Sequence, residues 1–180
     1  QSTKCDGTET CSRVNQKVFY HRINSPQSDD ILTIQFKDNP GWRMDAFVSD
    51  CGKYLFVSAR ETCRQNLLFY SKLDTENTPI VGQLELTPIF DKFEADYIYV
   101  TNDGDKVTMR TNKNAPNFKV VCFDLNDPTE EKWTNVIEEH EKDVLSSCTC
   151  VNEDMLAVIY LRDVVNVLEI RKLKDGTLIQ

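Results

Sequence analysis

Positive charge is scarce in this 180-residue sequence. It has 21 lysine and arginine residues against 29 aspartate and glutamate residues, which gives a formal net charge of −8. Proteins that bind nucleic acids neutralise phosphate groups and carry a basic footprint, so the charge balance argues against a nucleic-acid partner. No apolar run approaches the length that spans a bilayer, and we therefore expect no membrane partner either.

Residues with catalytic or metal-binding chemistry are few and scattered. The six glycines form neither a GxSxG nucleophile elbow nor a phosphate-binding loop. The two histidines, His21 and His140, have no serine or cysteine partner defined by spacing, and we interpret both as packed or solvated side chains. A zinc site needs four convergent ligands, which these residues do not readily supply. We predict no catalytic residue, no metal site and no cofactor within the chain.

The cysteines bear on the cellular compartment. There are seven of them, an odd number, and none forms a CxxC pair. That usage is typical of reduced thiols in a cytosolic protein, so we expect a cytoplasmic location. The polar N-terminus shows no basic-then-apolar secretory pattern. It also lacks an initiator methionine, and we expect the chain to be processed or cut from a longer one.

The sequence does contain a succession of short strands, rich in β-branched and aromatic residues and separated by turn signals. Helical periodicity is weak, and only NVIEEHEKDVL (135–145) favours a helical turn or two. The clearest predicted strands are KVFYH (17–21), ILTIQF (31–36), KYLFVSA (53–59), LLFYSKL (67–73), DYIYV (96–100), KVVCFDL (119–125), MLAVIY (155–160) and VVNVLEI (164–170).

The strands recur with a period near fifty residues. The segments AFVSDCGKYLFVS (46–58), YIYVTNDGDKVTMRT (97–111) and SCTCVNEDMLAVIYL (147–161) resemble one another. A period of this length, with four strands in each unit, is typical of the blades of a β-propeller. Two series of residues mark the repeat, the valines Val48, Val100 and Val151, spaced by 52 and 51, and the asparagines Asn15, Asn66, Asn117 and Asn166, spaced by 51, 51 and 49.

The predicted fold class is therefore all-β, with about three and a half four-stranded antiparallel blades. We predict one partial propeller domain over residues 1–180. Its parts are a loop and the outer strands of one blade (1–43), a blade (44–94), a second blade (95–143) and a third, nearly complete blade (144–180). Such a set cannot close a ring, so we expect the remaining blades to lie outside this chain.

Propeller geometry gathers the more distinctive residues on one face. Loops that join second to third strands share a face with the loops between blades, and the tight hairpin turns lie on the other. We interpret the shared face as a working face; the alternative, that one set of loops is simply longer, stays open. The residues expected there are Arg43, Arg60, Cys63, Thr111, Asn112 and Arg162.

Several longer stretches resemble the prolyl oligopeptidase family. The opening KCDGTETCSRVNQKVFYH (4–21) is similar to a family segment that runs K-x-D-G-T-E-T and then Q-K-L-Y-Y-H. The resemblance extends over essentially the whole chain. It also includes QSDDIL (27–32), VSDCGKYLFVSARETC (48–63), FEADYIYVTNDG (93–104), TNKNAPN (111–117), DPTEEKW (127–133), EHEKDVL (139–145) and LRDVVN (161–166).

The resemblance implies a function for a larger protein. Prolyl oligopeptidases are cytosolic serine peptidases that cleave short peptides on the C-terminal side of proline. Their catalytic triad lies in an α/β-hydrolase domain, and a seven-bladed propeller covers the active site and excludes large folded substrates. By this resemblance the chain is the middle of the propeller. Its partners would be the hydrolase domain of the same parent chain and short proline-containing peptides, and it would be inactive by itself.

The resemblance also assigns substrate-binding residues. The family's R-E-G-C motif matches RETC here, which places Arg60 and Cys63 at the non-primed side of the substrate pocket. That cysteine is a modifiable thiol in the family and not the nucleophile. Thr62 replaces the usual glycine, so the local backbone is expected to differ. Arg43 stands where the family often has an apolar pocket residue. Residues 1–14 match a mobile loop at the domain interface.

Two other functions remain open at the level of sequence. Propellers host many unrelated functions, so the chain could instead belong to a non-enzymatic scaffold that binds protein partners through its loop face. A related peptidase, such as an oligopeptidase B or an acylaminoacyl peptidase, is a third interpretation. A GxSxG elbow followed by an aspartate and a histidine in the downstream sequence would favour a peptidase over the scaffold.

Overall fold

The described residues form an all-β structure. The computed structural model describes residues 14–74 and 78–180, so most of the 1–14 loop lies outside them. Two short 3-10 turns, η1 (Gln27–Asp29) and η2 (Glu130–Lys132), accompany the strands. The strands are β1 (Lys17–Tyr20), β2 (Ile31–Gln35), β3 (Arg43–Val48), β4 (Tyr54–Arg60), β5 (Leu67–Lys72), β6 (Thr87–Phe90), β7 (Tyr97–Asp103), β8 (Lys106–Thr111), β9 (Lys119–Asp124), β10 (Thr134–Ile137), β11 (Val144–Val151), β12 (Met155–Arg162) and β13 (Val165–Lys172).

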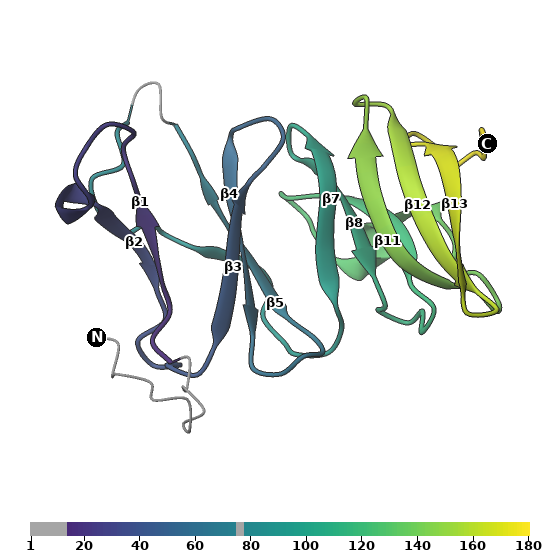
Figure 1. The fold of residues 1–180 in the computed structure, drawn as a ribbon, viewed down its shortest axis with the longest axis horizontal. Coiled ribbons are helices and arrows are strands. Elements are labelled where there is room, and N and C mark those ends of the chain that lie inside the picture. Colours follow the sequence, from purple (N-terminus) through teal and green to yellow (C-terminus); the bar gives the residue numbers. More distant parts are fainter. Residues whose placement is uncertain (1–13, 75–77) are drawn as a thin grey trace.

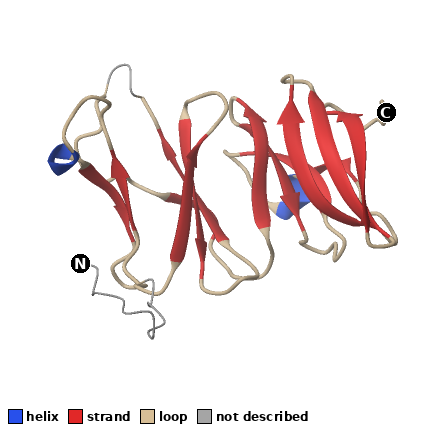
Figure 2. Ribbon diagram, in the orientation of Figure 1, coloured by secondary structure: helices blue, strands red, loops and turns tan. Residues whose placement is uncertain are grey.

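Each sheet is an antiparallel meander of strands that follow one another in the sequence. The sheet orders are β1-β2, β3-β4-β5-β6, β7-β8-β9-β10 and β11-β12-β13. The sheets stand side by side in a row, each one turned relative to the last (Figures 1 and 2). This arrangement confirms the predicted fold class, a partial β-propeller. None of the helical segments among the described residues is long and apolar enough to cross a membrane.

One prediction about local structure was wrong. Residues 135–145 contain no helix, because β10 ends at Ile137, β11 begins at Val144 and an irregular connection joins them. Val136 and Ile137 are 9% and 4% exposed. Both are β-branched side chains that pack well on a half-buried sheet, and burying them there outweighs the weak helical pattern of the acidic residues that follow.

The hydrophobic core lies between neighbouring sheets. Tyr54 and Phe56 alternate along β4 and face the next sheet, where Tyr97 and Met109 join the same cluster. A second cluster fills the space between the sheet of β7–β10 and that of β11–β13; its fully buried members include Leu145, Leu156 and Val158. The sheet of β7–β10 thus buries a face against each of its neighbours, and the stability of the row depends on such interfaces.

The last sheet also has a partner segment beside β13. Residues 177–180 run antiparallel to that strand, with a bridge between Arg171 and Leu178. The Ile179 amide donates to the Ile170 carbonyl at 2.7 Å, and the Ile170 amide donates to the Gln180 carbonyl at 2.8 Å. The residues after β13 therefore occupy the position that a fourth strand takes in the sheets before it.

Candidate functional site

The two edges of the row of sheets differ in their connections. The turns after β3, β7 and β11 lie along the upper edge in Figure 1, and the connections after β4, β8 and β12 lie along the lower edge. At the lower edge β4–β5 and β8–β9 are joined by longer loops, whereas β12 and β13 are joined by a two-residue turn. Thr111 ends β8 and Arg162 ends β12, both at the lower edge. We call this the loop edge; it corresponds to the predicted working face.

The structure brings the predicted site residues together at the loop edge. Arg43 begins β3 and Arg60 ends β4, and the two are direct cross-strand partners. Residues directly opposite in an antiparallel pair project on the same side of the sheet, so two cationic side chains share one small area. Cys63 follows in the loop between β4 and β5 as an exposed, free thiol.

Arg60 forms a bond between blades. Its Nη1 atom donates to the Asp96 Oδ1 atom at 2.6 Å, and the two side chains are only 20% and 16% exposed. Asp96 is held in turn, since its amide donates to the Asn112 Oδ1 atom at 2.7 Å. The guanidinium carries five N–H donors and this bond uses one of them, so the ion pair fixes the orientation of the group.

Arg43 supports the loop that carries Cys63. Its Nη2 atom donates to the Thr62 carbonyl at 2.9 Å. The Thr62 hydroxyl donates to the Arg64 carbonyl at 2.7 Å and accepts from the Arg64 amide at 3.2 Å, so this side chain closes its own turn. Thr62 does not take a positive φ; Gln65 does, at 65°. The left-handed residue of this loop therefore lies three positions beyond the expected glycine site.

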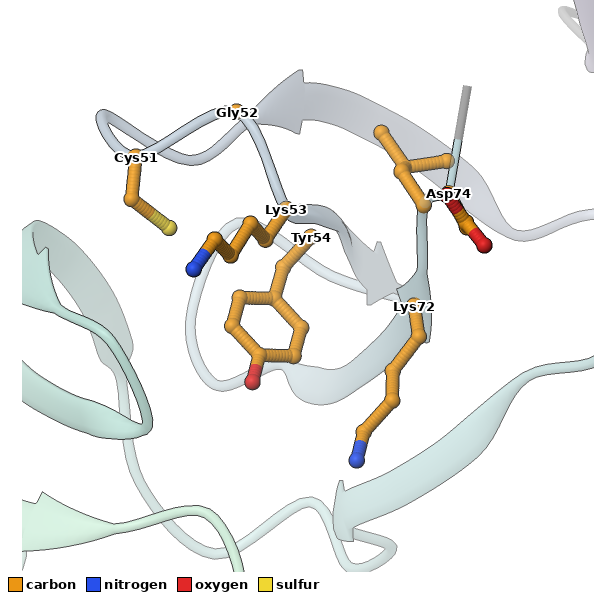
Figure 3. Close-up of a pocket in the computed structure, with 7 residues that line it drawn as sticks. Cys51, Gly52, Lys53, Tyr54, Lys72 and Asp74 are labelled. Atoms are coloured by element: carbon orange, nitrogen blue, oxygen red, sulfur yellow. The ribbon is translucent and has the colours of Figure 1, made fainter. Parts of the chain in front are cut away.

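The opposite edge carries a cavity that sequence reasoning missed. A volume of about 570 Å³ is lined by residues of the β3–β4 turn and the end of β5, and Cys51, Lys53 and Tyr54 project around it (Figure 3). The Tyr54 hydroxyl donates to the Asp105 Oδ1 atom of the next blade. The only sequence signal was the recurrence of the turn SDCGK (49–53) as NDGDK (102–106), 53 residues later, which places equivalent turns side by side.

The thiol of Cys51 lies in a polar setting. The Asn102 Nδ2 atom donates to its Sγ atom at 3.0 Å, and the Ser49 Oγ atom lies 3.4 Å from it. Burial acts to raise the pKa of Cys51, but these two hydrogen bonds and the nearby Lys53 outweigh it and lower that pKa. Cys148 is the opposite case, because burial raises its pKa to about 12. The cysteines therefore differ widely in thiolate content.

The histidines make local contacts. His21 Nδ1 lies 2.6 Å from Asp30 Oδ1, and His140 Nδ1 accepts the Asp143 amide at 2.8 Å. Within residues 14–74 and 78–180, no group of three or more His, Cys, Asp or Glu side chains is arranged to hold a metal ion. The loop edge therefore presents two guanidinium groups and an exposed thiol.

Comparison with known proteins identifies the family. Residues 2–180 match the family model described as "Prolyl oligopeptidase, N-terminal beta-propeller domain". The chain is 34% identical to prolyl oligopeptidase A of Amanita bisporigera over 164 residues. The matched region covers 91% of the chain and 21% of that protein. It is 32% identical over 123 residues to the prolyl endopeptidase of Elizabethkingia miricola, covering 68% of the chain and 16% of that protein.

Solved structures agree with this result. Prolyl oligopeptidase B of Galerina marginata, bound to a 35mer hydrolysis and macrocyclization substrate, superposes with a TM-score of 0.85 at 29% identity. That match covers 99% of this chain and 24% of the solved chain. The chain thus spans about a fifth of the length of its relatives. These 180 residues belong to the N-terminal β-propeller domain family of the prolyl oligopeptidases.

Proposed function

We propose that this chain is the substrate-gating propeller of a serine-type oligopeptidase that cleaves short peptides on the C-terminal side of proline. The observation that carries the proposal is the match of residues 2–180 to the propeller domain of that family. The 180 residues contain no GxSxG elbow. We therefore assign the catalytic triad to an α/β-hydrolase domain of the same parent chain, outside these residues.

In this proposal the propeller is seven-bladed, and these residues form its middle part. Residues 1–43 supply a loop and the outer strands of one blade, and 44–94, 95–143 and 144–180 supply the following three. The loop edge faces the hydrolase domain, because it holds the arginines and the thiol that a peptide could contact. Large folded proteins are excluded, since a substrate must fit between the loop edge and the second domain.

Arg43, Arg60 and Cys63 are the proposed substrate-binding residues. Arg60 is supported by its ion pair with Asp96, which holds the guanidinium in one orientation. A preoriented donor loses less conformational entropy when it binds a peptide carbonyl or carboxylate. Arg43 acts partly through the loop, since its bond to the Thr62 carbonyl positions the backbone beside Cys63. None of the three takes part in bond cleavage.

A cytoplasmic location belongs to the same proposal. Five cysteines lie within the described residues, and all five are free thiols. Reduced cysteines in that number suit a reducing compartment.

The experiment is a hydrolysis assay of the full-length protein. A blocked Gly-Pro reporter should be cleaved after proline, and the matched Gly-Ala reporter should be cleaved far more slowly. Alkylation at Cys63 should raise KM more than it lowers kcat, because the thiol lines the pocket without attacking the substrate. Absence of cleavage after proline would contradict the proposal and favour a non-enzymatic scaffold that binds proteins through the loop edge.

A further inference from the structure

A second cavity lies between two blades, near the loop edge but outside the proposed substrate pocket. Its volume is about 220 Å³. It is bounded by the end of β6, the start of β7, the loop after β8 and the η2 turn. Its main walls and rim are formed by Phe90, Tyr97, Trp133, Glu94, Glu130 and Lys113.

Three aromatic rings form the wall. Phe90 stacks on Tyr97 with ring centroids 3.9 Å apart and an interplanar angle of 15°, and Trp133 meets Phe90 edge-on at 5.6 Å and 81°. The indole is fixed, because its Nε1 atom donates to the Pro128 carbonyl at 2.8 Å. Aromatic rings held in this way attract organic cations through their negative faces.

The rim is more acidic than basic. Lys113 Nζ lies 2.8 Å from Glu94 Oε2, and the Tyr97 hydroxyl donates to Glu94 Oε1 at 3.2 Å. Glu130 accepts from the Asn114 side-chain amide at 2.6 Å, but no lysine or arginine among the described residues forms an ion pair with it. The pKa of Tyr97 is raised by burial first and then by the carboxylates of Glu94 and Glu130. Both carboxylates are therefore close enough to place negative charge beside the aromatic wall.

From this combination we propose that the cavity is a binding site for the side chain of a lysine in a peptide. The ammonium group would pair with Glu130 beside the ring of Trp133, and the methylene chain would pack against Phe90. Lys113 shows that the local chemistry suits an alkylammonium group, since its own ammonium is bonded to a carboxylate at the rim of this cavity. The volume admits one side chain and excludes a larger element. The site goes beyond the proposed peptidase activity and does not depend on it.

Binding is tested on the full-length protein by titration calorimetry at low salt. The probe is N-acetyl-Gly-Lys-Gly-amide, which contains no proline, and the control probe carries norleucine in place of lysine. The lysine peptide should bind about tenfold more tightly, which is the effect of one partly desolvated cation contact. Glu130→Gln keeps the acceptor for Asn114 but removes the charge, and it should abolish the preference.

Matched variants separate this site from general electrostatics. Glu131 is adjacent and, like Glu130, exposed, but it does not line the cavity, so Glu131→Gln removes the same charge and should leave the preference intact. Lys113→Ala removes a competing ammonium and should tighten binding severalfold. Trp133→Leu should weaken it. Equal affinity for the two peptides, or equal effects of the Glu130 and Glu131 substitutions, would overturn the proposal.

Cleavage of the Gly-Pro reporter, which carries no lysine, is measured on the same variants. It should be unchanged by Glu130→Gln. In the unsubstituted protein, equal affinity for the two probes with normal cleavage would refute this site alone, and absence of cleavage with an intact lysine preference would refute the peptidase alone.

Discussion

Replacement of Asn66 by alanine should loosen the junction between two blades. Asn66 is fully buried, directly before β5. Its Oδ1 atom accepts the Tyr97 amide at 2.8 Å, and its Nδ2 atom donates to the Tyr97 carbonyl at 3.1 Å. Alanine would leave both backbone groups of Tyr97 unpaired in the interior, at about 1–3 kcal/mol each. The expected loss of local stability is therefore about 2–6 kcal/mol.

Asn117 provides a matched control. It stands 51 residues later in the repeat, and its Nδ2 atom donates to the His140 carbonyl at 3.0 Å, but that bond is exposed to solvent. Water can replace it, so Asn117→Ala should cost about 1 kcal/mol or less. At both positions the side-chain amide bonds to a backbone carbonyl distant in sequence, buried for Asn66 and exposed for Asn117.

The assay is hydrogen exchange of the full-length protein, followed on peptides that cover β7. A local loss of 2 kcal/mol or more corresponds to exchange that is faster by at least about 30-fold. Asn66→Ala should show this increase at Tyr97 and the neighbouring residues, and Asn117→Ala should leave β7 unchanged. Equal exchange in the two variants would refute the argument that burial of the unpaired groups sets the cost.

Two further predictions concern the turns and the thiols. Gly176 has a φ of 67°, and a Cβ atom there would lie 2.0 Å from a backbone oxygen of β10. Gly104 has a similar φ of 54°, but a Cβ atom there would meet no atom within 4 Å. Gly176→Ala should therefore lower the melting temperature clearly more than Gly104→Ala. Alkylation by iodoacetamide, followed by mass spectrometry, should label Cys51 down to lower pH than an ordinary thiol, because its depressed pKa keeps more thiolate present, whereas Cys148 should stay unlabelled near neutral pH. Equal melting temperatures, or equal labelling of the two thiols, would contradict the respective prediction.

The fold could be predicted because each blade repeats one local pattern. Alternating apolar residues and turn residues recur about every 51 residues. Each unit of this repeat is specified by residues close together in the sequence, so the sequence alone displays it. The repeated asparagines marked a real feature: the Asn66 side chain bonds to the backbone of Tyr97 in the following blade, and the Asn117 carbonyl accepts the Leu145 amide of the blade after it. Residues 135–145 were misjudged because tertiary burial of Val136 and Ile137 decided their conformation.

The site could be predicted only in part. Sequence spacing and family resemblance placed Arg43 and Arg60 near each other, and the structure pairs them across two strands. The ion pair between Arg60 and Asp96 joins residues 36 apart and depends on how two blades meet. No local pattern encodes that contact. The same holds for the hydrogen bond that Asn102 of the next blade donates to Cys51. Both are properties of the interfaces between blades.

The most direct measurement is the steady-state kinetics of the full-length protein and its Arg60→Ala variant on the blocked Gly-Pro reporter. We expect cleavage after proline by both proteins, with KM raised in the variant and kcat little changed, because in the proposed function Arg60 binds the substrate without taking part in the chemistry. Absence of cleavage after proline, or a fall in kcat at constant KM, would contradict it.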